Sequence, residues 1–500
     1  MIVNADPAAL RSLALISVPV IAEASDTSAV AFRATLTQLA AFTALQSLVF
    51  TPPAHDVCGS NAHAILRLTQ LTLLHCSMPL PLALAGNLTT MRLRDVQLCW
   101  QNAAVISDMP SVNAVKLVGG PASAQALESV AELPALRRLD LSSRLPWSLS
   151  GTEVPDAVDA ARLPAQAVLC LHKLSLLQHL SLAGSSKINS GCMDFLAQLL
   201  SCTCLDLSFC RGLDGSALQH LAHMQRLVHL SLARCDRIQS SALAVLPQLT
   251  ALQSLDLCGC FALNDLACAT VATLPVLTRL DLRGCSKVTS SGLLALRQLV
   301  RLRWLELSSN TCDGTGVANM SLSLRCLTHL GLYGMRALQG DALRYLQRLP
   351  LRHLTLDNAQ RLGEAHLRHI SALRNLTELA LRFVPALTDN GLECLEGLHE
   401  LRSLTLHRAK SVHGGGLWHL ARCAELTALR LQHCESFDAC GLAFLSRHTQ
   451  LQWLEVHKCA RVEPVDFVQL PQLAALPDLI VTGMGDADNG AMQAAGFKTA

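Results

Sequence analysis

The residues best suited to chemistry in this chain of 500 are its 20 cysteines and 19 histidines, and neither set is placed at random. Regularly spaced thiols can hold a metal or form disulfides. Cysteine recurs as the ninth residue of a Leu-x-x-Leu-x-Leu-x-x-Cys pattern, at Cys76, Cys210, Cys235, Cys260, Cys285, Cys434 and Cys459. Other copies carry Ser185, Asn310, Met335, Ala359 or Val384 there, and no metal site would accept that set. We therefore predict no metal, small buried thiols that fill a turn, and a reducing, cytoplasmic compartment, with the nucleus as an alternative.

Four histidines share one slot, immediately before the second leucine of the pattern: His179, His229, His329 and His353. This slot points out of the pattern's apolar face, so we expect surface side chains. His329 and His353 come from neighbouring copies, which leaves a pair of metal ligands open as the minor alternative.

Catalytic and cofactor motifs are missing from the sequence. We find no phosphate loop, no His-Glu-x-x-His, no Gly-x-Ser-x-Gly and no dinucleotide fingerprint, so we expect neither enzyme activity nor a cofactor. The run Gly414-Gly415-Gly416 is interpreted as a permissive turn. The stretch Asp486-Ala487-Asp488-Asn489-Gly490 is interpreted as a terminal turn, because a calcium loop would need a later glycine and a closing glutamate.

The composition of the chain is dominated by leucine. Leucine accounts for 102 positions, while 16% of the residues are charged and 4% are aromatic. No uncharged apolar run is long enough to cross a bilayer, and Leu13–Ala24 is a poor secretory signal. The formal net charge of +2 gives no reason to expect nucleic acid or a membrane as the partner.

A repeat organises most of the chain. The second leucine of the pattern recurs at 25-residue intervals, with one interval of 24, at Leu180, Leu205, Leu230, Leu255, Leu280, Leu305, Leu330, Leu354, Leu379, Leu404, Leu429, Leu454 and Leu479. Degenerate copies precede it at Leu13, Leu48, Leu71, Met91, Val115 and Leu139, giving about nineteen repeats. We predict degenerate repeats and a cap over 1–143, an inserted loop over 144–168, regular repeats over 169–484 and a terminal cap or tail over 485–500.

Each copy combines a strand and a helix. The Leu-x-Leu alternation puts both leucines on one face of a short strand. Stretches such as Val288–Leu296 and Leu387–Leu395 then begin with a helix cap and continue with leucines three or four residues apart. We predict an α/β solenoid, a curved horseshoe with a parallel sheet on its concave face and helices on its convex face.

Runs such as Leu277–Thr289 carry a resemblance to the cysteine-containing class of leucine-rich repeats, best known from the substrate-binding halves of F-box ubiquitin-ligase subunits. The resemblance spans nearly the whole chain and implies the fold. No F-box is recognisable, because Leu10–Leu15 already has the pattern of a strand. The resemblance implies that the repeats form a binding platform, and it implies no catalysed reaction.

The concave face carries the candidate binding residues. Exposed Trp, Tyr and Arg are the types enriched at binding hot spots, and they gather between residues 279 and 457. The predicted protein-binding residues are Arg279, Asp281, Arg283, Trp304, Glu306, His329, Tyr333, His353, Asp357, Arg382, His407, Arg430, Trp453 and His457. Their mixed charges favour a protein or peptide partner.

The function expected is therefore a non-enzymatic scaffold, and membership of a complex of several subunits stays open. Three more specific alternatives also stay open. The first is a substrate-recognition subunit resembling the F-box receptors of ubiquitin ligases, and the second is a structural subunit of a large protist cytoskeletal or organellar assembly. The third is an enzyme regulator that wraps its target, similar to horseshoes of the ribonuclease-inhibitor type.

Overall fold

The structure, a computed structural model, describes residues 106–107, 111–118, 123–142, 163–308, 313–338, 341–385, 387–446, 448–463, 466–467, 476 and 478–482, and the backbone of four earlier strands. The chain divides into two compact units, Met1–Ile238 and Gln239–Ala500. The boundary between them follows β9 and does not coincide with any predicted domain boundary. We describe each unit separately.

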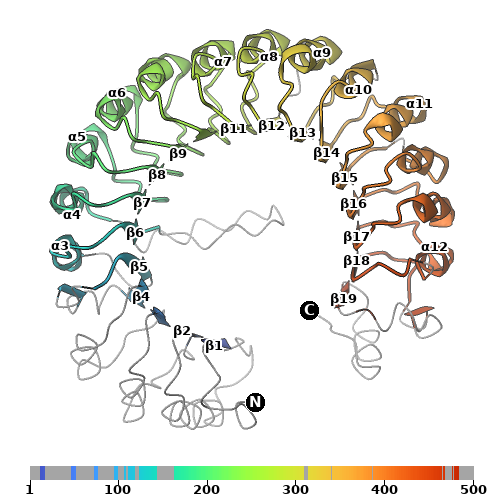
Figure 1. Ribbon diagram of the computed structural model, residues 1–500, viewed down its shortest axis with the longest axis horizontal. Coiled ribbons are helices and arrows are strands. Elements are labelled where there is room, and N and C mark those ends of the chain that lie inside the picture. The colour runs from blue at the N-terminus through green and yellow to red at the C-terminus, as the bar shows by residue number, and fades with distance from the viewer. Residues whose placement is uncertain are drawn as a thin grey trace. The chain divides into compact units, whose positions relative to one another are not determined.

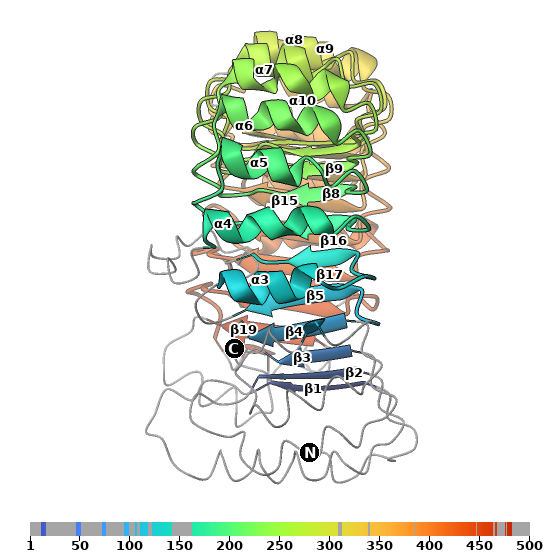
Figure 2. The same ribbon diagram turned by 90° about the vertical axis from the view of Figure 1, so that its left-hand side faces the viewer.

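The first unit is a coil of parallel strands, each paired with the next along the chain (Figure 1). Its strands are β1 (Ser12–Ile16), β2 (Ser47–Thr51), β3 (Leu73–Cys76), β4 (Asp95–Cys99), β5 (Ala114–Val118), β6 (Arg138–Asp140), β7 (His179–Ser181), β8 (Cys204–Asp206) and β9 (His229–Ser231). Its described helices are α3 (Ala124–Ala131), α4 (Ala165–Val168), α5 (Ser190–Leu196) and α6 (Gly215–Gln219), with 3₁₀ helices η5 (Leu169–Lys173) and η6 (His220–His223). Figure 2 shows these helices stacked in chain order on the outer side of the strands.

The second unit repeats the same arrangement more regularly. Its strands are β10 (Ser254–Asp256), β11 (Arg279–Leu282), β12 (Trp304–Ser308), β13 (His329–Tyr333), β14 (His353–Asp357), β15 (Glu378–Arg382), β16 (Ser403–His407), β17 (Ala428–Gln432), β18 (Trp453–His457) and β19 (Asp478–Thr482). Helices α7 (Asp265–Val271), α8 (Ser290–Leu296), α9 (Gly314–Ser323), α10 (Asp341–Leu346), α11 (Glu364–Leu367) and α12 (Ala439–Leu445) cover the outer side. The 3₁₀ helices η7 (Ser240–Gln248), η8 (Arg368–Ala372), η9 (Asn390–Leu395) and η10 (Gly415–Arg422) complete this layer.

Leucines from strand, turn and helix meet between the two layers. Leu280 and Leu282 of β11 are 0% and 1% exposed, and Leu305 beside them in β12 is 0% exposed. Leu293 and Leu296 of α8 are both fully buried and close the same layer from outside. Because a single repeat offers only one such layer, its leucines are buried only when neighbouring repeats stack on it.

The predicted repeat spacing is confirmed from Leu180 onward, where residues 24 or 25 apart pair across neighbouring strands, as Leu305 does with Leu330. Nineteen strands are described, which matches the predicted number of repeats. Two early assignments were wrong: Leu74 and Val96, instead of Leu71 and Met91, pair with their neighbours' register residues. Both stretches are rich in apolar residues, so several frames fit the pattern equally well. Cys76 consequently lies within β3 and not in the turn after it.

The cysteines of the turns are structural, as predicted. Cys210, Cys235 and Cys285 are fully buried, and each thiol donates a hydrogen bond to the carbonyl of the leucine that directly follows the strand of the preceding repeat, at 3.2 to 3.4 Å. Cys434 and Cys459 make the equivalent contact at 3.6 Å. All sixteen cysteines among the described residues are free thiols. The thiol therefore serves as a small apolar filler that also satisfies a carbonyl.

The predicted helix starts are confirmed in part. Thr289 caps α8 and accepts a hydrogen bond from the Ser291 amide at 3.2 Å. The stretch Leu387–Leu395 forms the 3₁₀ helix η9 instead of an α-helix. Asp389 precedes it but turns to the next repeat, where its carboxylate accepts from the Gly414 amide at 3.2 Å. A side chain that bridges two repeats is no longer available to cap its own helix.

Parts of the predicted organisation lie outside the described residues, namely 144–162 of the inserted loop and the tail over 485–500. Residues 165–168 at the end of the predicted loop form α4, which belongs to the outer layer. Gly414 adopts a φ of 110° and forms the permissive turn before η10, whereas Gly415 and Gly416 are the first two residues of that helix. No helix among the described residues has the length and apolar content needed to cross a membrane.

The leucine layer gives a direct test of stability. Leu330 is fully buried, whereas Leu322 on α9 is 52% exposed. Replacing Leu330 with alanine leaves a cavity and should lower the free energy of unfolding by about 2–5 kcal/mol, measured by urea denaturation. The matched control Leu322→Ala should change it by no more than about 0.5 kcal/mol. Equal effects of the two substitutions would contradict the layer described above.

Candidate functional site on the concave face

The strands β11–β19 present three rows of side chains on their concave face, because every second residue of a strand points to the same side. The first row contains Arg279, Trp304, His329, His353, Glu378, Ser403, Ala428, Trp453 and Asp478. The second row contains Asp281, Glu306, Gly331, Thr355, Ala380, Thr405, Arg430, Glu455 and Ile480. The third row contains Arg283, Ser308, Tyr333, Asp357, Arg382, His407, Gln432, His457 and Thr482. All fourteen predicted binding residues belong to these rows.

Four residues of the first row form a continuous stack. The Arg279 guanidinium lies over the Trp304 ring. The Trp304 and His329 ring centroids are 4.9 Å apart, and those of His329 and His353 are 5.3 Å apart. This spacing follows from the separation of about 4.8 Å between paired strands, which brings side chains of one row into contact. The stack presents a flat, preformed surface of aromatic and cationic groups.

The two predicted acidic residues of the second row are buried, although they face the concave side. Asp281 and Glu306 are each 3% exposed. Asp281 accepts hydrogen bonds from the Arg283 guanidinium at 2.6 and 3.0 Å. Glu306 accepts from Nε2 of His329 at 2.7 Å. These carboxylates therefore hold Arg283 and His329 in place, because a buried charge is stable only when it is paired.

Gly331 makes room for this arrangement. A Cβ atom at Gly331 would collide with the second carboxylate oxygen of Glu306 and lie 2.5 Å from Cε2 of Tyr333. Tyr333 covers the glycine, and the Arg283 guanidinium carbon lies 5.5 Å from the centroid of its ring. Burial raises the pKa of the Tyr333 hydroxyl, and the negative charge of Glu306 adds to this effect.

A second cluster runs along the end of the third row, where the strands β15–β18 enter their turns. We call it the histidine ladder and define it as Phe383, His407, His433 and His457. Successive ring centroids are 5.0, 5.3 and 5.1 Å apart, with edge-on geometry throughout. Burial lowers the pKa of His407 to about 4, with the charges of His433 and Arg382 adding to the effect. Burial also lowers the pKa of His433 and of His457. The ladder is therefore neutral at pH 7.

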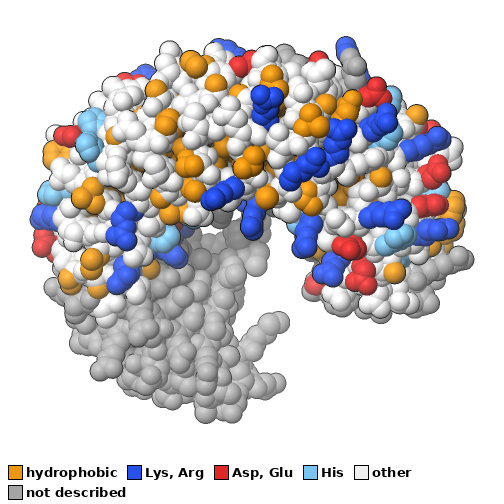
Figure 3. Space-filling model, turned by 45° about the horizontal axis from the view of Figure 1, so that its top comes forward, with side chains coloured by type: hydrophobic (Ala, Val, Ile, Leu, Met, Phe, Trp, Pro, Cys, Tyr) orange, Lys and Arg blue, Asp and Glu red, His pale blue; other side chains and the backbone are white. Residues whose placement is uncertain are grey.

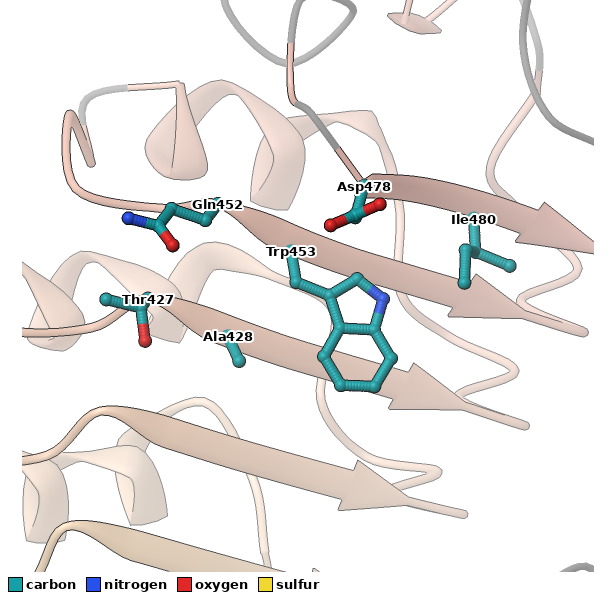
Figure 4. Close-up of a pocket in the computed structure, with 6 residues that line it drawn as sticks. All are labelled: Thr427, Ala428, Gln452, Trp453, Asp478 and Ile480. Carbon is teal, nitrogen blue, oxygen red and sulfur yellow. The ribbon is translucent and has the colours of Figure 1, made fainter. Parts of the chain in front are cut away.

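The last described strands border an open hollow of about 460 Å³. Thr427 directly before β17, Ala428 of β17, Gln452 directly before β18, Trp453 of β18, and Asp478 and Ile480 of β19 line it. In Figure 4 the Trp453 indole extends across the neighbouring strands, with the two β19 side chains on one side of it. Arg430 places its guanidinium carbon 4.1 Å from the Trp453 ring centroid and forms an ion pair with Glu455, with 3.3 Å between Nε and Oε2. The indole is thus held by a cation–π contact.

The structure brings most of the predicted residues into contact, and the exceptions have specific causes. His407 and His457 lie two strands apart and are joined only through His433, which the sequence prediction missed. Phe383, Arg408 and Lys458 were missed as well. All four occupy the turn slot directly after the third row, with φ between 49° and 53°. The signal for them was available, because the same slot holds glycine in other repeats, at Gly184, Gly259, Gly284 and Gly334.

No group of three or more His, Cys, Asp or Glu side chains within the described residues could hold a metal ion. His329 and His353 stack on one another, and each faces a carboxylate: Glu306 at 2.7 Å and Glu378 at 3.0 Å. Both rings are therefore engaged, each by a stacked neighbour and by a carboxylate. Basic, acidic and histidine side chains are interspersed over the C-terminal repeats, as the right-hand part of Figure 3 shows.

The repeat, the parallel strands and the outer helices define the chain as a leucine-rich repeat solenoid of the α/β class. No family model and no curated protein matches the sequence. Among solved structures, a chain of the Rad7 and Elc1 complex in yeast is 19% identical with a TM-score of 0.49, covering 64% of this chain and 85% of that one. A chain of the TLR13–ssRNA13 complex is 18% identical with a TM-score of 0.46, covering 89% of this chain and 60% of that one. An internalin (inlF) from Listeria monocytogenes str. 4b F2365 is 16% identical with a TM-score of 0.36, covering 81% of this chain and 94% of that one.

The packing around Gly331 yields a prediction. Gly331→Ala forces the added methyl group into the Glu306 carboxylate and should lower the free energy of unfolding by about 1–3 kcal/mol. Gly314→Ala is the matched control, because a Cβ there meets only ordinary contacts of 3.5 Å or more. Urea denaturation of both variants measures the difference in their free energies of unfolding. If Gly331→Ala is as stable as the control, Glu306 and Tyr333 are not packed as described.

The histidine ladder predicts a pH dependence. His407 has a pKa of about 4 in the folded chain, below the value of about 6.5 expected after unfolding. The unfolded chain therefore binds more protons between these two values, so stability is full above about pH 6.5 and falls as the pH drops toward 4. In the variant His407→Gln, stability should decrease less on acidification than in the parent chain. Stability is measured as the urea midpoint at several pH values. Replacing the exposed His399 with glutamine should leave the pH dependence of the parent chain unchanged. An equally reduced pH dependence in both variants would refute the prediction.

Proposed function

We propose that this protein is a non-enzymatic interaction scaffold that binds a protein or peptide partner on the concave face of its second unit. The observation that carries the proposal is the pairing of each tryptophan and tyrosine of the described concave rows with an arginine. Arg279 lies over Trp304, Arg283 lies near Tyr333, and Arg430 lies over Trp453. Trp, Tyr and Arg dominate the energetics of protein interfaces, especially when they are held rigid before binding.

The preorganisation of these pairs supports a binding role over a purely structural one. Buried carboxylates hold two of the face's basic groups, since Asp281 fixes Arg283 and Glu306 fixes His329. An ordinary solvated face would not need buried acids beneath its outer residues, because isolated surface charges are hydrated by water. A rigid face loses less side-chain entropy on binding, which leaves more of the contact energy for affinity.

We further propose that the protein works in a reducing compartment, with the cytoplasm as the first choice. The sixteen free thiols among the described residues support this choice, because an oxidising compartment favours disulfides.

The proposal predicts that the tryptophans of the concave face control partner recovery. Trp304→Ala together with Trp453→Ala should abolish recovery of protein partners in affinity purification followed by mass spectrometry, because each side chain is an expected hot spot of about 2 kcal/mol. Trp418→Ala is the matched control, since Trp418 lies on η10 and is 51% exposed on the outer side. A thermal melt of each variant separates lost binding from lost folding.

Four outcomes discriminate between the possible sites and functions. If partners are still recovered with the double variant but are lost with Trp418→Ala, the binding site lies on the outer face. Recovery of a Skp1-like adaptor and a cullin would identify the recognition subunit of a ubiquitin ligase, whereas a fixed set of structural proteins would identify an assembly subunit. Nuclease treatment of the lysate should leave recovery unchanged, and its loss would assign the face to a nucleic acid.

A further inference from the structure

The turn slot after the third row carries aromatic or cationic side chains in four successive repeats. Phe383, Arg408, His433 and Lys458 hold φ values of 49° to 53°, in the left-handed region that glycine adopts without steric cost. The slot is glycine in four other described repeats and holds Phe209, Arg234 or Asn358 in three more, with φ of 55° to 60°. The repeats of β15–β18 therefore differ from the others in the unbroken run of aromatic and cationic side chains, and not in the turn conformation itself.

The backbone shows why the slot cannot simply relax. The amides of Phe383, Arg408, His433 and Lys458 each donate to a carbonyl of the next strand, at 2.7 to 2.9 Å. These bonds fix the turn in the left-handed conformation at every repeat. The side chains are therefore projected along one edge of the sheet, at intervals of about 4.8 Å. From β15 to β18 this edge spans about 14 Å.

The edge has an excess of positive charge. Arg382, Arg408 and Lys458 make no ion pair within 4 Å among the described residues. Arg408 instead places its guanidinium carbon 4.6 Å from the Phe383 ring centroid. We call Arg382, Arg408 and Lys458 the edge cations.

The carboxylates that face this edge have other partners. Glu455 pairs with Arg430 at 3.3 Å and accepts from Gln432 at 2.6 Å. Glu435 pairs with Lys410 at 3.1 Å. Asp357 is the exception, because it lies beside Arg382 in the neighbouring strand and partly offsets that cation; burial raises the pKa of this carboxyl and the charge of Arg382 lowers it.

The histidine ladder lies between the edge cations. His407 is surrounded by His433, Arg382, Arg408 and His457, all of which disfavour its protonation. His433 faces His457, Lys458 and Arg408, and the carboxylate of Glu435 opposes their effect on its pKa. His457 donates to or accepts from Thr482 Oγ1 at 2.6 Å and faces Lys458 and Glu455. An anion placed here would be attracted by the edge cations and would also favour protonation of the ladder.

We propose that this edge, formed by the histidine ladder and the edge cations, binds an acidic segment of the protein partner. An extended peptide with a carboxylate at every second residue places them about 6.6 Å apart, so three of them span about 13 Å and match the edge. The proposal rests on the proposed function for the identity of the partner as a protein, but its test does not need that partner.

Proton uptake accompanies this binding. The free ladder is neutral because the pKa values of its histidines lie below the ordinary range. Bound carboxylates raise them again, so the complex holds more protons than the free chain. Affinity for an acidic segment therefore rises as the pH falls from about 8 to about 6, while the carboxylates of the ligand stay ionised.

The test uses the full chain and fluorescein-labelled octaglutamate in a fluorescence anisotropy titration. Octaglutamate should bind, octalysine should not, and affinity should rise on acidification from about pH 8 to about pH 6. The double variant Arg408→Gly, Lys458→Gly should bind at least about fivefold more weakly, since it removes two charges. It should also unfold at an unchanged or higher urea concentration, because glycine relieves the left-handed turns.

The matched control is Arg344→Gln with Arg368→Gln, which removes two exposed charges from α10 and η8 on the outer side. It should leave octaglutamate binding unchanged. Equal binding by the glycine variant and the parent chain would overturn the proposal and leave the turn side chains structural. A labelled single-stranded RNA of equal charge that binds more tightly than octaglutamate would also overturn it in favour of a nucleic acid.

The two proposals fail separately. Trp304→Ala with Trp453→Ala should abolish partner recovery while octaglutamate still binds. If octaglutamate does not bind but the tryptophan variants lose the partner, the proposed function stands and only the acidic segment is refuted.

Discussion

Stacking of neighbouring repeats is the constraint on which this structure depends. A repeat of about 25 residues offers a single layer of leucines, and that layer is buried only when the next repeat covers it. Leu280, Leu305 and Leu330 are accordingly all fully buried in consecutive strands. The same need explains the turn cysteines, because a thiol is small enough to fill the turn and still reaches the carbonyl of the preceding repeat.

Stacking also determines what the concave face can do. Equivalent side chains of successive strands lie about 4.8 Å apart, so any row of aromatic or charged residues becomes a column of contacts. Trp304, His329 and His353 stack for this reason, and Glu306 is drawn beneath them as the hydrogen-bond partner of His329. The face thereby acquires fixed side chains without a loop or a cofactor to hold them. Such a surface is suited to recognition.

The turns after the strands show that the repeat also accepts local cost. A left-handed residue is needed in nearly every repeat, and glycine meets that need most easily. Arg408, His433 and Lys458 meet it with side chains that add charge to the edge of the sheet. Their amides still donate to the next strand, so the fold keeps its hydrogen bonds. The difference between repeats is therefore chemical while the backbone stays the same.

The sequence by itself determined the repeat length, the strand register from Leu180 onward and the three outward positions of each strand, because leucine periodicity reports directly on burial. It did not determine the frame around Leu74 and Val96, where several apolar residues fit. It also placed Glu306 among the outward residues without showing that it is buried, since burial there depends on Gly331 and Tyr333 of the next repeat. The histidine ladder needed the tertiary structure as well: His407 and His433 lie 26 residues apart and meet only because stacking brings a strand end beside the next turn. The periodicity of the sequence shows which face of a strand each residue occupies. Which side chains that residue contacts is decided only by the packing of neighbouring repeats.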